Sequence, residues 1–423
     1  MQTYIKTYGC TLNQADSDII NSVLDSANIG QAESMQDADV IIVNTCTVKN
    51  PTEQKISDLL KKLESEKRKV LVTGCMAAAN PDIISNASPS ASIVTISNLE
   101  DMPDAVSRTA SGERVVMSSL QKRDRLASFK PRQGPVARIP VSDGCMSSCS
   151  FCETKFARSA LNSFSEDLIL NAVKYSVKSG AVEIDITSQD IGAYGADRKS
   201  NIALLMEKIS RIEGFFKVRI GMLNPERLAG YINEFASALG NEKFYKFAHL
   251  PLQSGSDSVL KSMRRNYTVD QYLEFVDVLR SYVPGISIET DMIVGYPTET
   301  DEDFTNSIEV LKSFRPDVTN ISRFGARRHT AAHKMKQLDQ TLIKERSSEM
   351  YSAVRGIQHG INGKFVGQRI TALMTESTGV SINGRTDSYK QVVLRGASSD
   401  LIGKLINVSV HSATANALYC SVA

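Results

Sequence analysis

The sequence predicts an α/β protein in three parts: an N-terminal parallel sheet of the flavodoxin-like or Rossmann-like type, a central partial (β/α)6 barrel and a small C-terminal all-β barrel. The 423 residues exceed the usual size of one hydrophobic core. Strand-like apolar runs alternate with helical periodicity up to about residue 358, as in parallel βαβ units. The remaining residues hold short β-branched runs separated by Gly, Asn and Ser, which favour a small β-barrel.

The N-terminal part is predicted to span residues 1–115. Its expected strands cover residues 3–8, 40–43, 69–73 and 92–96. A helix is expected over residues 16–27, because Ile19, Ile20, Val23 and Leu24 recur at helical spacing. These elements predict one parallel sheet whose strands end at a common edge.

A basic linker is predicted over residues 116–135, followed by the central barrel over residues 136–358. The linker holds Pro, Gly and a group of basic side chains, namely Lys122, Arg123, Arg125, Lys130 and Arg132. Six strands are expected in the barrel, over residues 137–141, 182–187, 217–222, 247–250, 287–294 and 318–324. A helix over residues 340–358 closes this part.

The C-terminal part, residues 359–423, carries six basic and three acidic side chains. Its expected strands cover residues 369–374, 380–382, 391–394, 405–411 and 417–422. The whole chain has a net charge of only +2, so contacts to nucleic acid must come from local patches such as this one.

The N-terminal residues indicate the cellular compartment, and the seven cysteines indicate the type of chemistry. The first residues lack the apolar core of a signal peptide, and no apolar run is long enough to cross a bilayer, so a cytoplasmic protein without membrane contact is expected. An odd number of cysteines in a reducing compartment argues against disulfides. Metal or cluster ligation is the better interpretation.

Cys145, Cys149 and Cys152 form a Cys-x3-Cys-x2-Cys motif directly after an expected strand. Three thiolates on one loop hold three irons of a [4Fe–4S] cluster and leave the fourth iron open to an external amino-carboxylate. Phe151 offers a ring on which an adenine packs. The alternative is structural zinc, which wants four ligands, and no fourth Cys or His lies nearby in the sequence.

The motif resembles that of the radical S-adenosylmethionine (SAM) superfamily, which implies a [4Fe–4S] cluster and SAM as cofactors. By this resemblance, Gln189 and Asp190 occupy the place of a Gly-Gly-Glu segment that orients the methionine amino group. Gln253 and Ser254 are candidates for the ribose hydroxyls. Each of these residues could equally be a turn or capping residue.

Cys10, Cys46 and Cys75 each follow the end of an expected strand in the N-terminal sheet. A lone buried cysteine is more often a small apolar residue than a ligand. Because the carboxyl ends of parallel strands share one edge, however, three thiols are expected to meet there. A second three-cysteine cluster is predicted, and Cys420 is expected in the core of the C-terminal barrel.

Longer motifs resemble the methylthiotransferases over nearly the whole chain, and the C-terminal part resembles the RNA-binding TRAM domain, an OB-like barrel. The matching stretches include residues 8–17, 44–46, 73–75, 249–256 and 290–297. The resemblance is strongest to the archaeal and eukaryotic branch, as seen in residues 11–16, 154–158 and 187–195. Residues 159–163 and 326–329 depart from the family pattern.

This resemblance implies transfer of a methylthio group to C2 of N6-threonylcarbamoyladenosine (t6A) beside the tRNA anticodon. It further implies two SAM molecules, two [4Fe–4S] clusters, an electron donor and a sulfur source. Two sister activities stay open, on isopentenyladenosine in tRNA and on an aspartate of a ribosomal protein. A different class of answer is a non-catalytic, metal-stabilised RNA-binding protein.

Basic side chains are the candidates for RNA contacts, because anticodon loops are recognised by base stacking and by cations on the backbone. Besides the linker, the candidates are Arg158, Arg323, Arg327, Arg328, Arg385 and Lys390. Runs of charge are more often a solvated surface, so each residue alone is weak support.

Overall fold

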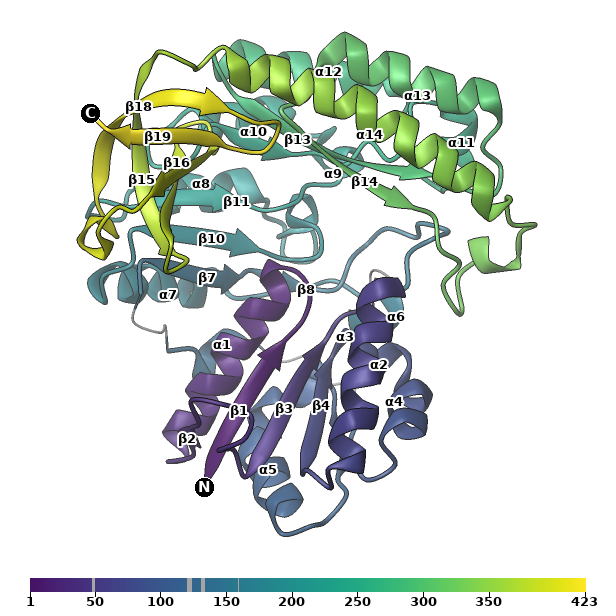
Figure 1. Ribbon diagram of the computed structural model, residues 1–423, viewed down its shortest axis with the longest axis vertical. Helices are drawn as coiled ribbons and strands as arrows, with labels where there is room; N and C mark the ends of the chain where they lie inside the picture. The colour runs from purple at the N-terminus through teal and green to yellow at the C-terminus, as the bar shows by residue number, and fades with distance from the viewer. Residues whose placement is uncertain (48–49, 120–123, 131–133, 159) are drawn as a thin grey trace.

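The computed structural model describes residues 1–47, 50–119, 124–130, 134–158 and 160–423. Lys122, Arg123 and Arg132 of the predicted linker and Ser159 of the first departure lie outside the described residues. Figure 1 shows an N-terminal sheet below a larger barrel, with a small β-barrel at the upper left of the view. No described helix has the length and apolar character that a membrane span needs.

The N-terminal sheet is entirely parallel and has the strand order β2-β1-β3-β4-β5-β6. Its strands are β1 (Gln2–Thr7), β2 (Gly30–Gln31), β3 (Val40–Thr45), β4 (Val70–Gly74), β5 (Ser92–Val94) and β6 (Val116–Met117). The four predicted strands are confirmed. The edge strands β2 and β6 were not predicted, because two residues carry no periodic signal.

Helices cover both faces of this sheet. Side chains of α1 (Thr11–Ser26) and α5 (Met102–Ala110) pack on one face, around Val40 and Ile42. Side chains of α2 (Asn50–Ser65) and α4 (Pro81–Ala87) pack on the other, around Ile41 and Val43. Alternate residues of β3 thus face opposite layers, as a two-sided parallel strand requires.

Six parallel strands form the central partial barrel, in the positions expected. Two sheets, β11-β10-β7 and β12-β13-β14, are joined by the parallel bridges Val218–Phe244 and Met222–His249. The strands are β7 (Val136–Pro140), β10 (Glu183–Thr187), β11 (Lys217–Ile220), β12 (Phe247–His249), β13 (Ser287–Val294) and β14 (Val318–Arg323). The fold is therefore the expected open (β/α)6 barrel.

Helices surround the outer side of the barrel (Figure 1). They are α7 (Glu166–Lys178), α8 (Ile202–Ser210), α10 (Ile232–Leu239), α12 (Val269–Tyr282), α13 (Asp301–Phe314) and α14 (Gln340–Gly363). Ile184 and Ile186 of β10 belong to the shared apolar core, whereas the alternating Asp185 is buried among charged side chains. Alternation along the strands therefore separates an apolar layer from a polar one.

The C-terminal residues form a closed barrel of five strands, as expected. They are β15 (Arg369–Ser377), β16 (Ser381–Thr386), β17 (Gln391–Arg395), β18 (Leu405–Ala413) and β19 (Leu418–Val422). Cys420 is buried in the barrel's core, where it was predicted to be.

Candidate active site

Cys10, Cys46 and Cys75 lie together at the carboxyl edge of the N-terminal sheet. They follow β1, β3 and β4, which are neighbours in the sheet. A Cβ atom placed on Gly9 would lie 2.8 Å from Cys46 Cβ, so the loop holding Cys10 passes directly over Cys46. The Cys10 and Cys75 sulfurs lie 4.0 and 3.7 Å from one shared atom, Asn13 Oδ1. The topology thus gathers three thiols from distant positions in the sequence.

Asn13, in the first turn of α1, holds this edge together. Its side-chain nitrogen, Nδ2, donates to the backbone carbonyl oxygens of Tyr8, at 2.9 Å, and Thr45, at 2.7 Å. The backbone carbonyl oxygen of Asn13 accepts a hydrogen bond from Asn44 Nδ2 at 2.7 Å. Because Asn13 is fully buried, these bonds fix the two loops that carry Cys10 and Cys46.

Cys145, Cys149 and Cys152 lie on the loop that follows β8 (Ser142–Asp143). Ser150 anchors this loop, since its backbone N–H donates to Met263 O at 3.0 Å and its hydroxyl to Ser262 O at 2.9 Å. The N–H of Cys152 donates to Cys149 O at 3.2 Å, which turns the loop back on itself. These bonds hold the second group of thiols in place.

Polar side chains follow β10 and β11, and two of them, Asp190 and Asn224, contact the cysteine loop. Asp190 is buried, with Oδ2 3.9 Å from Cys145 Sγ and Oδ1 accepting from the Asn224 N–H at 3.0 Å. Burial raises its pKa to about 6. Asn224 Nδ2 donates to Ser147 Oγ at 2.8 Å, while Asn224 Oδ1 and Gln189 Oε1 have no hydrogen-bond partner among the described residues. Such atoms suit a polar ligand.

Comparison with known proteins accounts for this arrangement. Residues 2–95 match the model of the Uncharacterized protein family UPF0004, and residues 139–311 match that of the Radical SAM superfamily. A probable threonylcarbamoyladenosine tRNA methylthiotransferase of Archaeoglobus fulgidus is 39% identical over 99% of this chain and 98% of its own length. The chain belongs to the radical SAM methylthiotransferase family. It is accordingly a transferase.

A human relative fits the same assignment, and a solved structure shares the fold. The threonylcarbamoyladenosine tRNA methylthiotransferase of Homo sapiens is 32% identical over 96% of this chain and 72% of its own length. The radical S-adenosylmethionine methyltransferase TsrM of Kitasatospora setae superposes with a TM-score of 0.60, at 11% identity, over 84% of this chain and 89% of its own. The superfamily assignment brings a [4Fe–4S] cluster and SAM as cofactors.

The other residues predicted to bind SAM in this methylthiotransferase each have a different environment. Gln253 adopts a left-handed backbone, with φ of 73°, and its N–H donates to Asp291 O at 2.8 Å beside β13. Ser254 is buried, and its hydroxyl accepts from the Ser256 N–H at 3.3 Å. Phe151 packs against a small apolar cluster that includes Tyr296. Their contacts to SAM stay predictions.

The two thiol groups lie on elements that pack against each other. Cys75 begins α3 (Cys75–Ala79), which packs on α6 (Thr154–Arg158), and α6 begins two residues after Cys152. Asn80 Nδ2 donates to Glu153 Oε1 at 2.8 Å across this contact. In Figure 1 the arrowheads of β1, β3 and β4 point toward the central barrel. The fold therefore brings both groups to the boundary between sheet and barrel.

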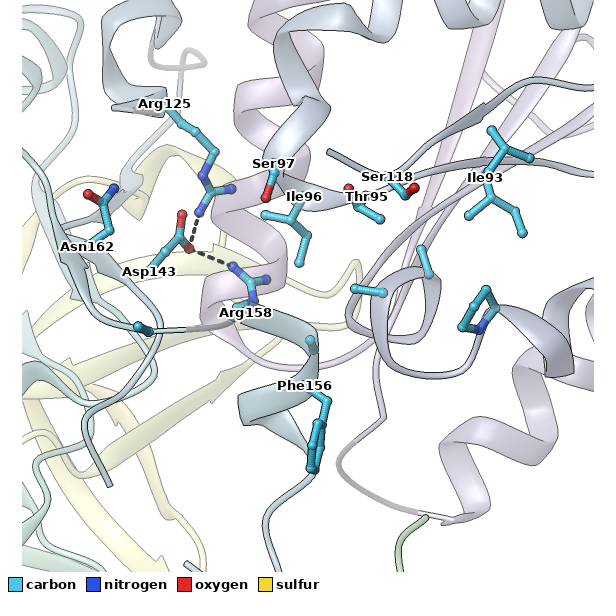
Figure 2. A pocket seen from close by; sticks show the side chains of 16 residues that line it. Ile93, Thr95, Ile96, Ser97, Ser118, Arg125, Asp143, Phe156, Arg158 and Asn162 are labelled. Atoms are coloured by element: carbon cyan, nitrogen blue, oxygen red, sulfur yellow. Dashed lines mark hydrogen bonds and ion pairs between the residues drawn. The ribbon is translucent and has the colours of Figure 1, made fainter. Parts of the chain in front are cut away.

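A buried ionic network, which the sequence did not predict, crosses the same boundary. Arg125 contacts Asp16 Oδ1 and Asp143 Oδ1, each at 2.5 Å. Arg158 contacts Asp143 Oδ1 at 3.1 Å and also pairs with Asp16. Figure 2 shows both guanidinium groups converging on Asp143. Two arginines and two aspartates balance one another here, which lets Arg125, Arg158 and Asp16 remain buried and Asp143 partly buried.

A pocket of about 240 Å³ lies beside this network, between the N-terminal sheet and α6 (Figure 2). Ile93, Thr95 and Ile96 line it from one side, and Phe156 and Arg158 from the other. In the described part of the chain, none of the six cysteines is among its lining residues. The pocket is therefore an interdomain space that neither group of thiols lines.

Several arginines predicted to contact RNA are engaged between domains. The Arg158 side chain is 1% exposed. Arg327 pairs with Glu53 of α2 at 2.8 Å, and Arg328 with Asp82 of α4 at 2.6 Å. Arg323 is the last residue of β14 and is exposed. It lies on the same face of the strand as Ile321, which packs against the core. RNA contact by these residues stays a prediction, and burial of Arg158 argues against its part.

The two predicted residues of the C-terminal barrel also face another domain. Lys390 Nζ lies 2.7 Å from Asp317 Oδ1 of the central barrel, and its side chain is 9% exposed. The Arg385 guanidinium lies 4.6 Å from the centre of the Tyr389 ring of the same barrel, and Arg385 lines a pocket together with Glu183 and Asp185 of β10. Both therefore help to dock the small barrel, and their RNA contacts stay predictions.

Proposed function

We propose that this chain transfers a methylthio group to C2 of N6-threonylcarbamoyladenosine beside the anticodon of tRNA. The observation that carries the proposal is the convergence of Cys10, Cys46 and Cys75 at a site separate from the Cys145 motif. A radical SAM enzyme needs one cluster for the radical, and a second three-thiol site offers a place for sulfur. The archaeal and human relatives that bear this activity in their names support the choice of substrate.

Each thiol group has a donor set that fits a [4Fe–4S] cluster with one open iron. We assign Cys10, Cys46 and Cys75 to one cluster and Cys145, Cys149 and Cys152 to the other. Burial raises the pKa of the Cys75 thiol to about 12 and that of Cys145 to about 11. A bound metal supplies the positive charge that favours the thiolate of such buried sulfurs.

The chain's own residues orient the cofactor and the substrate in this proposal. When bound, the cluster of the N-terminal thiols would hold the sulfur to be transferred, and SAM would supply the methyl group and, on reductive cleavage at the other cluster, an organic radical. The Asp190 carboxylate would accept hydrogen bonds from the methionine ammonium, and the unpartnered Gln189 Oε1 and Asn224 Oδ1 would provide further acceptors. Packing of α3 on α6 keeps the two groups of thiols in register, since positioning is most of what a protein adds to radical chemistry.

The domains would divide the work as the sequence predicts. Residues 1–115 hold the sulfur-bearing cluster, residues 136–358 bind SAM, residues 116–135 link the two, and residues 359–423 bind tRNA. The reaction also consumes electrons and sulfur, so a reductant and a sulfur source are required partners. The cytoplasm, where tRNA is modified, is the expected location.

Nucleoside analysis of bulk tRNA from a deletion strain tests the substrate. The 2-methylthio derivative of threonylcarbamoyladenosine should disappear, the unmodified t6A should accumulate, and other thiolated nucleosides should persist. Re-expression of the intact chain should restore the product. If that nucleoside persists while 2-methylthio-isopentenyladenosine vanishes, or if neither changes, the proposed substrate is wrong.

Iron analysis tests the two clusters. After anaerobic reconstitution the intact chain should hold about eight irons and release 5′-deoxyadenosine on reduction with SAM. Cys10→Ala and Cys145→Ala should each lose about half of the iron, and only Cys145→Ala should lose SAM cleavage. Cys420→Ala is the matched control and should keep both clusters, because Cys420 lies in the core of the C-terminal barrel. Full iron in Cys10→Ala contradicts the assignment.

A further inference from the structure

Arg158 physically connects the two groups of thiols. It ends α6, the short helix that begins two residues after Cys152. Its side chain leaves that helix and enters the N-terminal domain, where Nη2 donates to Asn13 Oδ1 at 3.1 Å. With a side chain only 1% exposed, Arg158 is closed to solvent. A residue next to one thiol group in sequence thus contacts the residue that organises the other.

The guanidinium of Arg158 lies beside the thiols of the N-terminal group. Asn13 Oδ1, which accepts from Arg158, is 3.7 Å from Cys75 Sγ and 4.0 Å from Cys10 Sγ. This geometry places a fixed positive charge close to both sulfurs. Such a charge favours negative charge on them.

Salt-bridge partners hold this guanidinium in place. Asp16 pairs with Arg158 from α1, and Asp143, two residues before Cys145, accepts from its Nη1 at 3.1 Å. Arg125 binds the same two carboxylates. A side chain clamped by two carboxylates and an amide has little freedom to leave the thiols, so its charge acts at a defined position.

The second group of thiols has a comparable arginine. Arg265 Nη1 donates to Cys149 Sγ at 3.5 Å, and its Nε donates to the Tyr267 hydroxyl at 2.9 Å. Arg265 is also buried. In each group, therefore, a buried guanidinium of fixed charge lies at or beside one sulfur.

We infer that Arg158 is a positioning residue that sets the charge environment of the Cys10, Cys46 and Cys75 cluster and couples it to the SAM-binding loop. This inference rests on the proposed function. A positive group beside cluster sulfurs stabilises the reduced, more negative state and so raises the reduction potential. Its second consequence is geometric, because the same side chain fixes α6 against the N-terminal sheet.

Potentiometry of the isolated first cluster tests the charge effect. A chain with Cys145→Ala, Cys149→Ala and Cys152→Ala keeps only the N-terminal cluster, whose spectroscopic signal is followed against applied potential. Adding Arg158→Gln, which leaves Asp16 paired with Arg125, should shift the midpoint to a more negative value. Arg108→Gln removes an exposed arginine of the same domain, paired with Glu113, and should leave the midpoint unchanged.

The outcomes separate the inference from the proposed function. If the triple-alanine chain with Arg158 intact binds no iron, the first cluster itself is absent and the proposed function fails. If iron is bound and the midpoint does not move, the inference on Arg158 is overturned. If the Gln variant loses its iron, Arg158→Lys, which retains the charge, should recover it, and equal loss in both variants also overturns the inference.

Turnover in the otherwise intact chain tests the coupling. Arg158→Gln should still produce 5′-deoxyadenosine, because Cys145, Cys149 and Cys152 remain. Methylthiolated RNA per 5′-deoxyadenosine should fall at least about tenfold, which corresponds to about 1.4 kcal/mol. An unchanged ratio overturns the coupling, and Arg158→Lys should give an intermediate value.

Discussion

The ring of Tyr389 lies 4.9 Å from the ring of Phe247. The turn of the C-terminal barrel that holds Tyr389 therefore packs against the first residue of β12 in the central barrel. Arg219 lies over both rings, 5.4 Å from each centre. The adjacent Asp387 binds Lys217 at 2.6 Å and Lys246 at 3.2 Å. Lys217 and Phe247 are first residues of their strands. The small barrel therefore closes the end of the partial barrel opposite the cluster loops.

Tyr389→Ala should release this docking. Loss of a buried aromatic ring costs about 3–5 kcal/mol in a packed site, and the ring also contacts Tyr245 at 4.8 Å. Limited proteolysis should cut the variant before residue 369 faster than the intact chain. Tyr389→Phe keeps the ring and should resist cleavage like the unmodified protein. Equal cleavage of the alanine variant and the intact chain would show that the small barrel docks by other contacts.

Gly74→Ala should disrupt the turn that presents Cys75. Gly74 has φ of +90°, and an added Cβ would lie 2.4 Å from the Thr45 carbonyl oxygen. The strain and clash together should lower the free energy of unfolding by roughly 2–4 kcal/mol and reduce the iron held by the N-terminal group. Gly112→Ala is the control, since its φ is +94° with no atom within 4 Å of the new Cβ. Similar losses in both variants would refute the clash.

Arg327→Gln should weaken the contact between the barrel and the N-terminal domain. The Arg327 and Glu53 side chains are 9% and 18% exposed, so removing one partner leaves a poorly solvated charge and should cost about 1–3 kcal/mol. The pair Arg328 and Asp82 is more than half exposed on both sides, and Arg328→Gln should cost under about 1 kcal/mol. Denaturant unfolding measures both, and a double variant with Glu53→Gln should recover part of the first loss.

Glu183 should make stability depend on pH. Burial, with the neighbouring carboxylate of Asp185, raises the pKa of Glu183 from its ordinary value of 4.5 to about 7. The folded state then binds this proton more tightly than the unfolded state, so stability from this group is full below about pH 4.5 and declines as pH rises through 7. Glu183→Gln cannot ionise, and should flatten that decline in denaturant midpoints measured from pH 5 to pH 8. An equal decline in the variant would contradict the assignment.

Local patterns predicted most of the architecture. Alternating apolar runs located all six barrel strands and the five strands of the small barrel to within a few residues. The Cys-x3-Cys-x2-Cys motif placed three sulfurs on one loop without any knowledge of the fold. The convergence of Cys10, Cys46 and Cys75 also followed from sequence, because parallel strands end at one edge.

No local sequence pattern indicated which side chains pair across domains. Arg158, Arg327, Arg328 and Lys390 were candidates for RNA contact, yet each forms an ion pair with a residue far away in the chain. The roles of Asn13 and of the pairing between Asp16 and Arg125 were missed for the same reason. Distant charges meet through tertiary packing, which no short spacing encodes.

The order of apolar and polar residues determined by itself the three folding units and the two groups of cysteines, since both depend on short-range periodicity and on the ends of strands. Tertiary structure alone decided which charges are exposed and which are buried in pairs. An arginine has the same local signature in both settings, and its function follows from the carboxylates that another domain places around it.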